Sequence, residues 1–315
     1  MRGRTVARGL LATGLVLVLA GCASEPVDGE AFPDWDVVDS RAAERFDAQL
    51  VLLDSAIEGS SPFRSDSSTD VTGVSYVHAT YGDKDTGSQS VVAIRGNPAS
   101  VFIQQTDADE GYTIDTLHVG GESVDYLLLG DGYAPLAPTP WVEVPTVYGY
   151  PGEDDLVAGL RTMCFVDGFQ TVCEVREAIA RTAESERGDA MRRFVRTEDD
   201  GSVLSETEVT LAAVLEDGMI LNLPPEISDE LSDEMLESFV PVSLWQDADG
   251  QLLKMELNGT VRGTDGAEDL VIQIGFEITG KATRKDFPAA PAPADVTVVP
   301  DAEVDAFYTE MGNLT

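Results

Sequence analysis

The fold is decided most clearly by residues 239–257, which read FVPVSLWQDADGQLLKMEL. Two apolar runs flank the turn Asp247-Ala248-Asp249-Gly250, a combination that is typical of an antiparallel hairpin. Another strand is expected at Val271–Thr279, because apolar and polar side chains alternate there as they do in a strand with one buried face. These segments predict an antiparallel sheet in the C-terminal part of the chain.

Similar strands, separated by turn residues, are expected in the rest of the chain. Their expected ranges are Val74–Tyr81, Gln89–Arg95, Ser100–Thr106, Thr113–Val119, Ser123–Leu129, Trp141–Val144, Ala190–Glu198, Ser205–Val214, Phe239–Gln246 and Gln251–Asn258. Short strands joined by tight turns predict an antiparallel meander. A sheet of about ten strands has to curl or split, because twist accumulates across it.

Helices are expected in between. One begins at Asp39 or Ser40 and ends at Gly59, with apolar residues at helical spacing. Others are expected at Glu153–Met163, Thr171–Ala183, Ile227–Met235 and Asp301–Met311, the last after an Ala/Pro-rich stretch, 288–293, that ends the regular structure. The expected class is α+β, a large curved antiparallel sheet with helices packed across one face.

Composition excludes several classes of function. The chain has 315 residues, and 57 Asp and Glu against 20 Lys and Arg give a formal charge of −37. A chain this acidic is repelled by phosphates, so it is not expected to bind nucleic acid. Hydrophobic residues make up 43% of the chain, enough for a packed core. Three cysteines are too few for a disulfide-rich scaffold.

The N-terminus resembles an export signal. Three arginines precede the apolar run Leu10–Ala20, which is too short to span a bilayer as a helix. The run ends in Leu19-Ala20-Gly21-Cys22, which resembles the lipobox of bacterial lipoproteins, so Cys22 is expected to carry the lipid anchor. The alternative is an ordinary signal peptide with a chance cysteine.

This interpretation divides the chain into four parts. Residues 1–21 are the signal peptide, and 22–38 are the lipidated cysteine and an acidic tether. Residues 39–300 form the folded domain, and 301–315 are a C-terminal tail with a short helix. The expected location is the outer face of the cell membrane.

Cys164 and Cys173 are expected to form a disulfide, because that is the usual state of a cysteine pair outside the cytosol. Free thiols are the alternative. The pair lies at the facing ends of the two expected middle helices, which it would staple together. A small hairpin turning at Asp167-Gly168 is a second arrangement.

Three Asp- and Gly-rich segments each resemble half of a calcium loop: Asp83–Gly87, Asp107–Gly111 and Asp247–Gly250. None has the full pattern with a terminal Glu, and the same residues favour tight turns. We therefore expect turns there, and neither a metal nor a cofactor.

Catalytic motifs are not found in the sequence. It has no nucleophile elbow, no Ser-x-x-Lys, no zinc-protease motif and no phosphate-binding loop. His78 and His118 each fall on an expected strand, where a structural role is the usual one. No catalytic residue is therefore assigned, and an envelope hydrolase using two carboxylates is kept only as a third candidate function.

The chain resembles the LppX/LprG-type actinobacterial lipoproteins and their distant relatives LolA and LolB. The resemblance rests on the lipobox at Cys22, the helix at 40–58, the Trp-Val-Glu-Val strand at 141–144, the hairpin at 239–257, the strand at 271–279 and Phe287-Pro288-Ala289. It implies a half-open β-barrel whose concave apolar face holds acyl chains.

The positions expected to line that face are those with the clearest alternation. They are Phe102, Leu117, Leu127, Val209, Leu211, Leu244, Ile272, Ile274 and Phe276. The first candidate function is a membrane-anchored lipoprotein that binds or shuttles a lipid-like ligand at the cell envelope. The second is a non-enzymatic adaptor or sensor with a packed core and no ligand cavity. The sequence identifies no protein partner.

Overall fold

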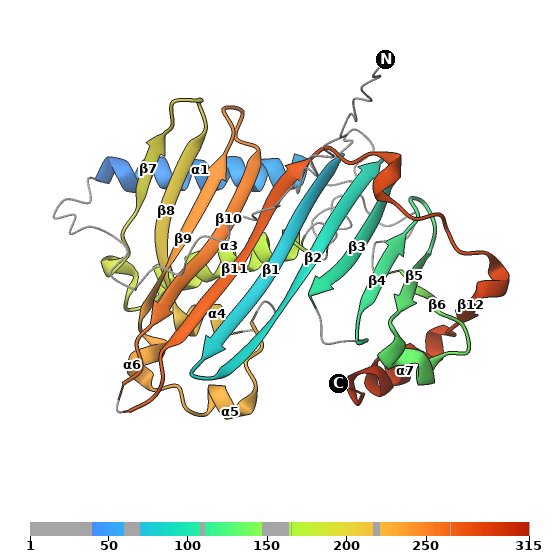
Figure 1. Ribbon diagram of the computed structural model, residues 1–315. Helices are drawn as coiled ribbons and strands as arrows, with labels where there is room; N and C mark the ends of the chain where they lie inside the picture. Colours follow the sequence, from blue (N-terminus) through green and yellow to red (C-terminus); the bar gives the residue numbers. More distant parts are fainter. Residues whose placement is uncertain are drawn as a thin grey trace, which may run out of the picture.

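The computed structural model describes residues 40–59, 70–107, 111–146, 164, 166–216, 221–264 and 266–314 (Figure 1). The described residues form one twelve-stranded sheet with helices packed on it. The sheet is not closed into a barrel, since β7 and β12 are separate edges. This confirms the expected α+β class and the half-open, mostly antiparallel sheet.

The strands fall into two blocks along the chain. The first block is β1 Val71–Tyr81, β2 Lys84–Gly96, β3 Ala99–Asp107, β4 Ile114–His118, β5 Val124–Leu129 and β6 Trp141–Pro145. The second block is β7 Phe194–Thr197, β8 Val203–Thr210, β9 Phe239–Gln246, β10 Leu252–Val261 and β11 Leu270–Gly280, followed by β12 Val296–Val298.

Each block is an antiparallel meander, and the two are joined by the pairing of β1 with β11. In this pairing Val77 lies opposite Ile274 and Ser75 lies opposite Phe276. The strand order is β12-β6-β5-β4-β3-β2-β1-β11-β10-β9-β8-β7. Only β12, which adds to the edge of β6, pairs in parallel among the described strands.

Two long helices, α1 Ser40–Gly59 and α3 Phe169–Glu184, lie across one face of the sheet (Figure 1). We call this the inner face. The α3 side chains identify it, because Thr171 Oγ1 lies 3.4 Å from Ser75 Oγ and the Phe169 ring lies 5.1 Å from the Phe276 ring. The stripe expected to bury α1 is confirmed by Phe46 and Leu53, which are fully buried.

Strand β8 ends earlier than expected, at Thr210. The predicted strand Ser205–Val214 is wrong from Leu211 onward, where the chain forms the short helix α4 Leu211–Leu215. The Thr210 hydroxyl accepts a hydrogen bond from Ala213 N and caps this helix. Leu211 therefore lies at the first position of a helix and not on a strand.

Other segments also differ from their predictions. The single helix expected at 227–235 is divided into α5 Pro225–Ser228 and α6 Asp233–Leu236, because the Ser232 side chain caps the second. Regular structure resumes after the Ala/Pro-rich stretch as β12. The expected C-terminal helix is present as α7 Val304–Gly312, preceded by the 3-10 turn Asp301–Glu303. The expected helix 153–163 lies outside the described residues.

The buried apolar side chains form two clusters. The larger joins α1, α3 and α4 to the inner faces of β1–β3 and β7–β11. The smaller lies at the other end of the sheet, where Phe307 and Met311 of α7 pack on Leu127, Val142 and other residues of β5 and β6. The two ends of the sheet are thus covered by helices from different parts of the chain.

Phe276 fixes α3 to the line where the two blocks meet. Its ring is fully buried and packs on Phe169. A Cβ atom added to Gly73 of β1, or to Gly168 just before α3, would overlap this ring. Gly168 also has a φ of +86°, a backbone conformation that favours glycine. The start of α3 therefore needs both the conformational freedom and the small size of glycine.

We predict that Gly168→Ala lowers the free energy of unfolding by about 1–3 kcal/mol, because it adds backbone strain and overlaps Phe276. Gly312→Ala is the matched control, since a Cβ there meets nothing within 4 Å. It should change stability by less than about 0.5 kcal/mol. Urea unfolding followed by circular dichroism measures both; equal effects would contradict the role assigned to Gly168.

Candidate functional site

Six of the nine expected lining residues lie on the inner face. The cross-strand registers place them there together, and all six are buried: Leu127, Val209, Leu244, Ile272, Ile274 and Phe276. Phe276 packs on α3, as described above. These side chains form the apolar surface on which the helices lie, and whether any of them touches a ligand stays a prediction.

Phe102 and Leu117 lie on the opposite, outer face. They are cross-strand partners, whereas their neighbours Val101 and Ile103 point to the inner face with the large cluster. Alternation along one strand shows which residues share a face, but only the pairing shows which face the helices cover. The assignment of these two residues to the concave face was therefore wrong.

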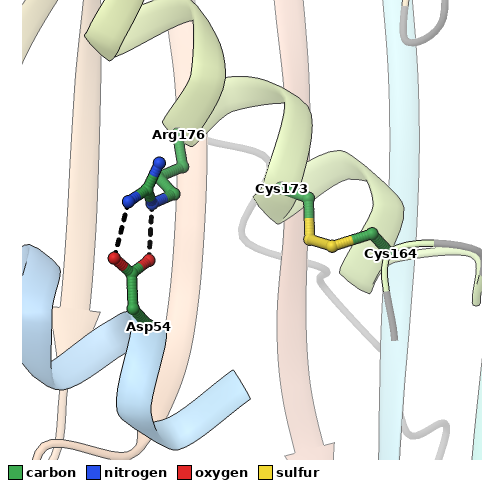
Figure 2. The surroundings of a disulfide bond; sticks show 4 residues. All are labelled: Asp54, Cys164, Cys173 and Arg176. Carbon is green, nitrogen blue, oxygen red and sulfur yellow. Dashed lines mark hydrogen bonds and ion pairs between the residues drawn. A yellow bond between two sulfur atoms is a disulfide. The ribbon is translucent and has the colours of Figure 1, made fainter. Parts of the chain in front are cut away.

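The two long helices are joined by an ion pair (Figure 2). Arg176 of α3 donates from Nε and Nη2 to the two carboxylate oxygens of Asp54 in α1, at 2.5 and 2.6 Å. This hydrogen bonding raises the pKa of the Arg176 guanidinium above its ordinary value. Both side chains are partly exposed, so solvent screens the pair.

A disulfide lies one turn away from this ion pair on α3 (Figure 2). Cys164 and Cys173 are bonded, with Cα atoms 5.7 Å apart, which confirms the expected pairing. Asp167 and Gly168 lead directly into α3, so the alternative hairpin at that turn is wrong. The bond ties the segment before α3 to the second turn of the helix.

A buried polar cluster lies on the inner face between the two apolar clusters. His118 Nδ1 is 2.8 Å from Asp125 Oδ1, and the Thr146 hydroxyl donates to the same oxygen at 2.9 Å. His118 is 2% exposed and Asp125 is 3% exposed. A buried carboxylate is costly without such partners, and these contacts offset that cost.

The geometry of this cluster differs from that of a hydrolytic triad. Thr146 Oγ1 lies 3.2 Å from His118 Nδ1, on the same ring nitrogen as Asp125. In a triad the hydroxyl and the carboxylate contact opposite ring nitrogens. His118 was expected to be structural, and its contacts agree with that. Asp125 alternates with Leu127 onto the same face of its strand, and this is the signal in the sequence for a buried carboxylate here.

The outer face carries a second polar network, at the centre of the sheet. The Tyr76 hydroxyl donates to Glu256 Oε1 at 2.7 Å, and Lys254 Nζ lies 3.2 Å from the same oxygen. Lys254 also lies over the Trp245 ring. Burial, followed by the nearby Glu256 charge, raises the pKa of Tyr76 above its ordinary range. The network joins β1, β9 and β10 on the side away from the helices.

In the acidic segment Asp247–Gly250, the Asp247 side chain stabilises a tight turn. Its Oδ1 accepts hydrogen bonds from the backbone N–H of Asp249 and Gln251, both at 2.9 Å. Among the described residues, no group of three His, Cys, Asp or Glu side chains is placed to hold a metal ion. Part of the second segment, 108–110, and Cys22 lie outside the described residues.

None of the described helices is both long enough and apolar enough to cross a bilayer.

No family model and no curated protein matches the chain. Among solved structures, it is similar to the lipoprotein LppX of Mycobacterium tuberculosis, with 12% identity, a TM-score of 0.32 and coverage of 75% of this chain and 94% of that one. An uncharacterized conserved protein of Thermus thermophilus gives 10% identity, a TM-score of 0.30 and coverage of 80% and 99%.

A LolA superfamily protein of Nitrosomonas europaea gives 11% identity, a TM-score of 0.25 and coverage of 76% and 97%. Both groups that the sequence resembles are therefore among these structures. At such low identities and TM-scores, the likeness does not bear on what this chain binds.

The candidate site is the inner face of β2–β4, next to the region on which α1 and α3 pack. Val92, Ile94 and Val101 continue the apolar surface there, and all three are buried. His118 and its partners mark the far limit of this surface, since Val101 pairs with His118. The site is thus an apolar surface that ends at a buried polar cluster.

We predict that Asp54→Asn lowers the free energy of unfolding by about 0.5–1 kcal/mol at low salt, the value of a screened surface pair. The loss should shrink as sodium chloride is added, because salt screens the pair in the parent protein. Asp47→Asn, on the exposed side of the same helix, is the control and should show a smaller loss. A salt-independent loss would contradict the ionic origin.

Proposed function

We propose that the chain is an exported lipoprotein, anchored through Cys22, that binds an apolar ligand on the inner face of its open sheet. One observation carries the proposal: the apolar inner face continues over β2 and β3, beyond the strands β7, β8 and β11 on which α1 and α3 pack. Burial of an alkyl chain on such a surface contributes about 25 cal/mol per Å², without any polar motif.

The shape of the surface supports the same ligand class. The sheet is open, so a long chain can reach its inner face from an edge. A closed barrel would have no such edge. The polar cluster at His118 lies beside the apolar surface, and its buried groups are hydrogen-bonded to one another, so it marks where the apolar part of a ligand would end. We therefore propose an amphiphile with a long apolar part, handled at the outer side of the membrane.

A second candidate function is favoured by the packing under the helices. Phe46, Leu53 and Val172 are at most 1% exposed and fill the space between α1, α3 and the sheet. A protein packed in this way over its whole inner face would serve as an adaptor or sensor without a ligand. The two functions differ in whether the surface over β2 and β3 accepts a molecule.

Native mass spectrometry of the purified mature protein, followed by organic extraction, tests the carrier function. We expect an additional mass from a co-purified lipid. Ile103→Trp, on the inner face of β3, should reduce this occupancy severalfold, because the larger ring fills the apolar surface. Gln104→Trp is the control, because Gln104 points outward on the same strand. A bare mass, with no uptake of added lipid, would favour the adaptor.

The anchor has a separate test. We predict that Cys22→Ser moves the protein from the membrane fraction to the soluble fraction, because the acyl chains that hold it are no longer attached. Fractionation followed by immunoblotting measures this. Retention of the variant in the membrane after a salt wash would show that the anchor is assigned wrongly.

A further inference from the structure

Helix α1 is apolar on two sides. Phe46, Leu53 and Ala56 are buried against the sheet, as expected for a covering helix. A second line of small or apolar side chains faces solvent, and we call it the α1 strip: Ala48, Val51, Leu52 and Ser55. Val51 is 62% exposed and Leu52 is 44% exposed, two of the few large hydrophobic side chains on the described surface. Val51 and Leu52 are consecutive, and Ala48 and Ser55 lie about one turn before and after them, so the four side chains share one side of the helix.

The α1 strip carries no charge, although the chain as a whole is strongly acidic. Among the residues of α1 whose side chains the structure describes, 42–57, the exposed charges are Glu44, Arg45 and Asp47, which lie in its N-terminal half. Asp54 is paired with Arg176 on α3. Leu52 borders the turn between β9 and β10, where it lies next to Gly250. Acidic groups flank the uncharged strip, in the N-terminal half of α1 and at the exposed Asp249 of this turn, so the strip is suited to a surface that is not anionic.

We propose that the α1 strip rests on the lipid bilayer that holds the anchor, with neutral headgroups at the contact. The proposal rests on lipidation of Cys22, which belongs to the proposed function. Seventeen residues lie between Cys22 and Ser40, and such a segment spans at most ~60 Å. Helix α1 is the first described element after it, so the reach of this segment sets the largest distance between α1 and the membrane.

The size of the strip favours a bilayer over a protein partner. A stable protein interface has roughly 20–30 residues on each side, and two large apolar side chains are far fewer. A tethered protein needs much less, since the anchor raises the local concentration of the membrane surface. The geometry also fits a carrier, because α1 covers one part of the inner face and its opposite side would meet the membrane from which an apolar ligand comes.

A probe at position 51 tests the contact. The mature lipoprotein with Val51→Cys is labelled with an environment-sensitive fluorophore and reconstituted into phosphatidylcholine vesicles that contain nitroxide-labelled lipid. Val298→Cys on β12 is the matched control, because Val298 is 61% exposed and lies at the opposite edge of the sheet. Along the sheet, eleven strand spacings separate β12 from β7 by ~50 Å.

We expect lipid quenching at position 51 to exceed that at position 298 severalfold. Adding Leu52→Ser to the labelled protein should reduce the quenching. Equal quenching at the two positions overturns the proposal. The proposal is also overturned if the fluorophore at position 51 is shielded only after a second protein is added, because the α1 strip would then bind a protein and not lipid.

The mass of the same sample shows whether Cys22 carries lipid. Quenching at 51 without that lipid would support the contact while refuting the anchor. Lipidated protein without quenching at 51 would refute the contact and leave the anchor standing.

Discussion

The structure depends on the pairing of β1 with β11. Without this pairing the chain would contain two separate meanders, β1–β6 and β7–β11, each with an additional open edge and an apolar face. Val77 lies opposite Ile274, so a very long loop has to close before the pairing contributes. The antiparallel ladder along Thr72–Tyr81 of β1 offsets that cost, and it brings the inner faces of both blocks into one apolar surface.

Side chains on both faces hold this junction in one register. On the inner face, Phe276 packs on Phe169 and leaves room only for glycine beside it. On the outer face, Tyr76 and Lys254 satisfy the buried carboxylate of Glu256. A shift of one residue would turn Phe276 outward and leave Glu256 among the apolar side chains under α3, without partners. The opposite requirements of the two faces therefore specify the register.

Local patterns were enough to predict most elements, because the alternation in β11 or the helical spacing in α1 is set by the neighbouring layer. They were not enough for the arrangement of those elements. The cap at Thr210 ends β8 although the apolar pattern continues through Leu211. Phe102 alternates as clearly as Ile274, yet it faces outward, since only the partner strand determines which face is covered. The partner of Asp54 is on another helix, and no local pattern indicates such a pair.

The attachment of α3 limits where a ligand would fit. Its first turn is held at Phe276, its middle is bound to α1 through Arg176, and near its end the Thr182 hydroxyl accepts a hydrogen bond from Thr210 N. A molecule entering beneath α3 would have to break buried contacts at both ends of the helix. An apolar chain over β2–β4 would have to displace the groups that cover Val92, Ile94 and Val101, which are at most 1% exposed, but it would leave α3 in place, because that helix packs on β8 and β11. If the protein binds an apolar chain, that chain should lie over β2–β4 with the helices in place.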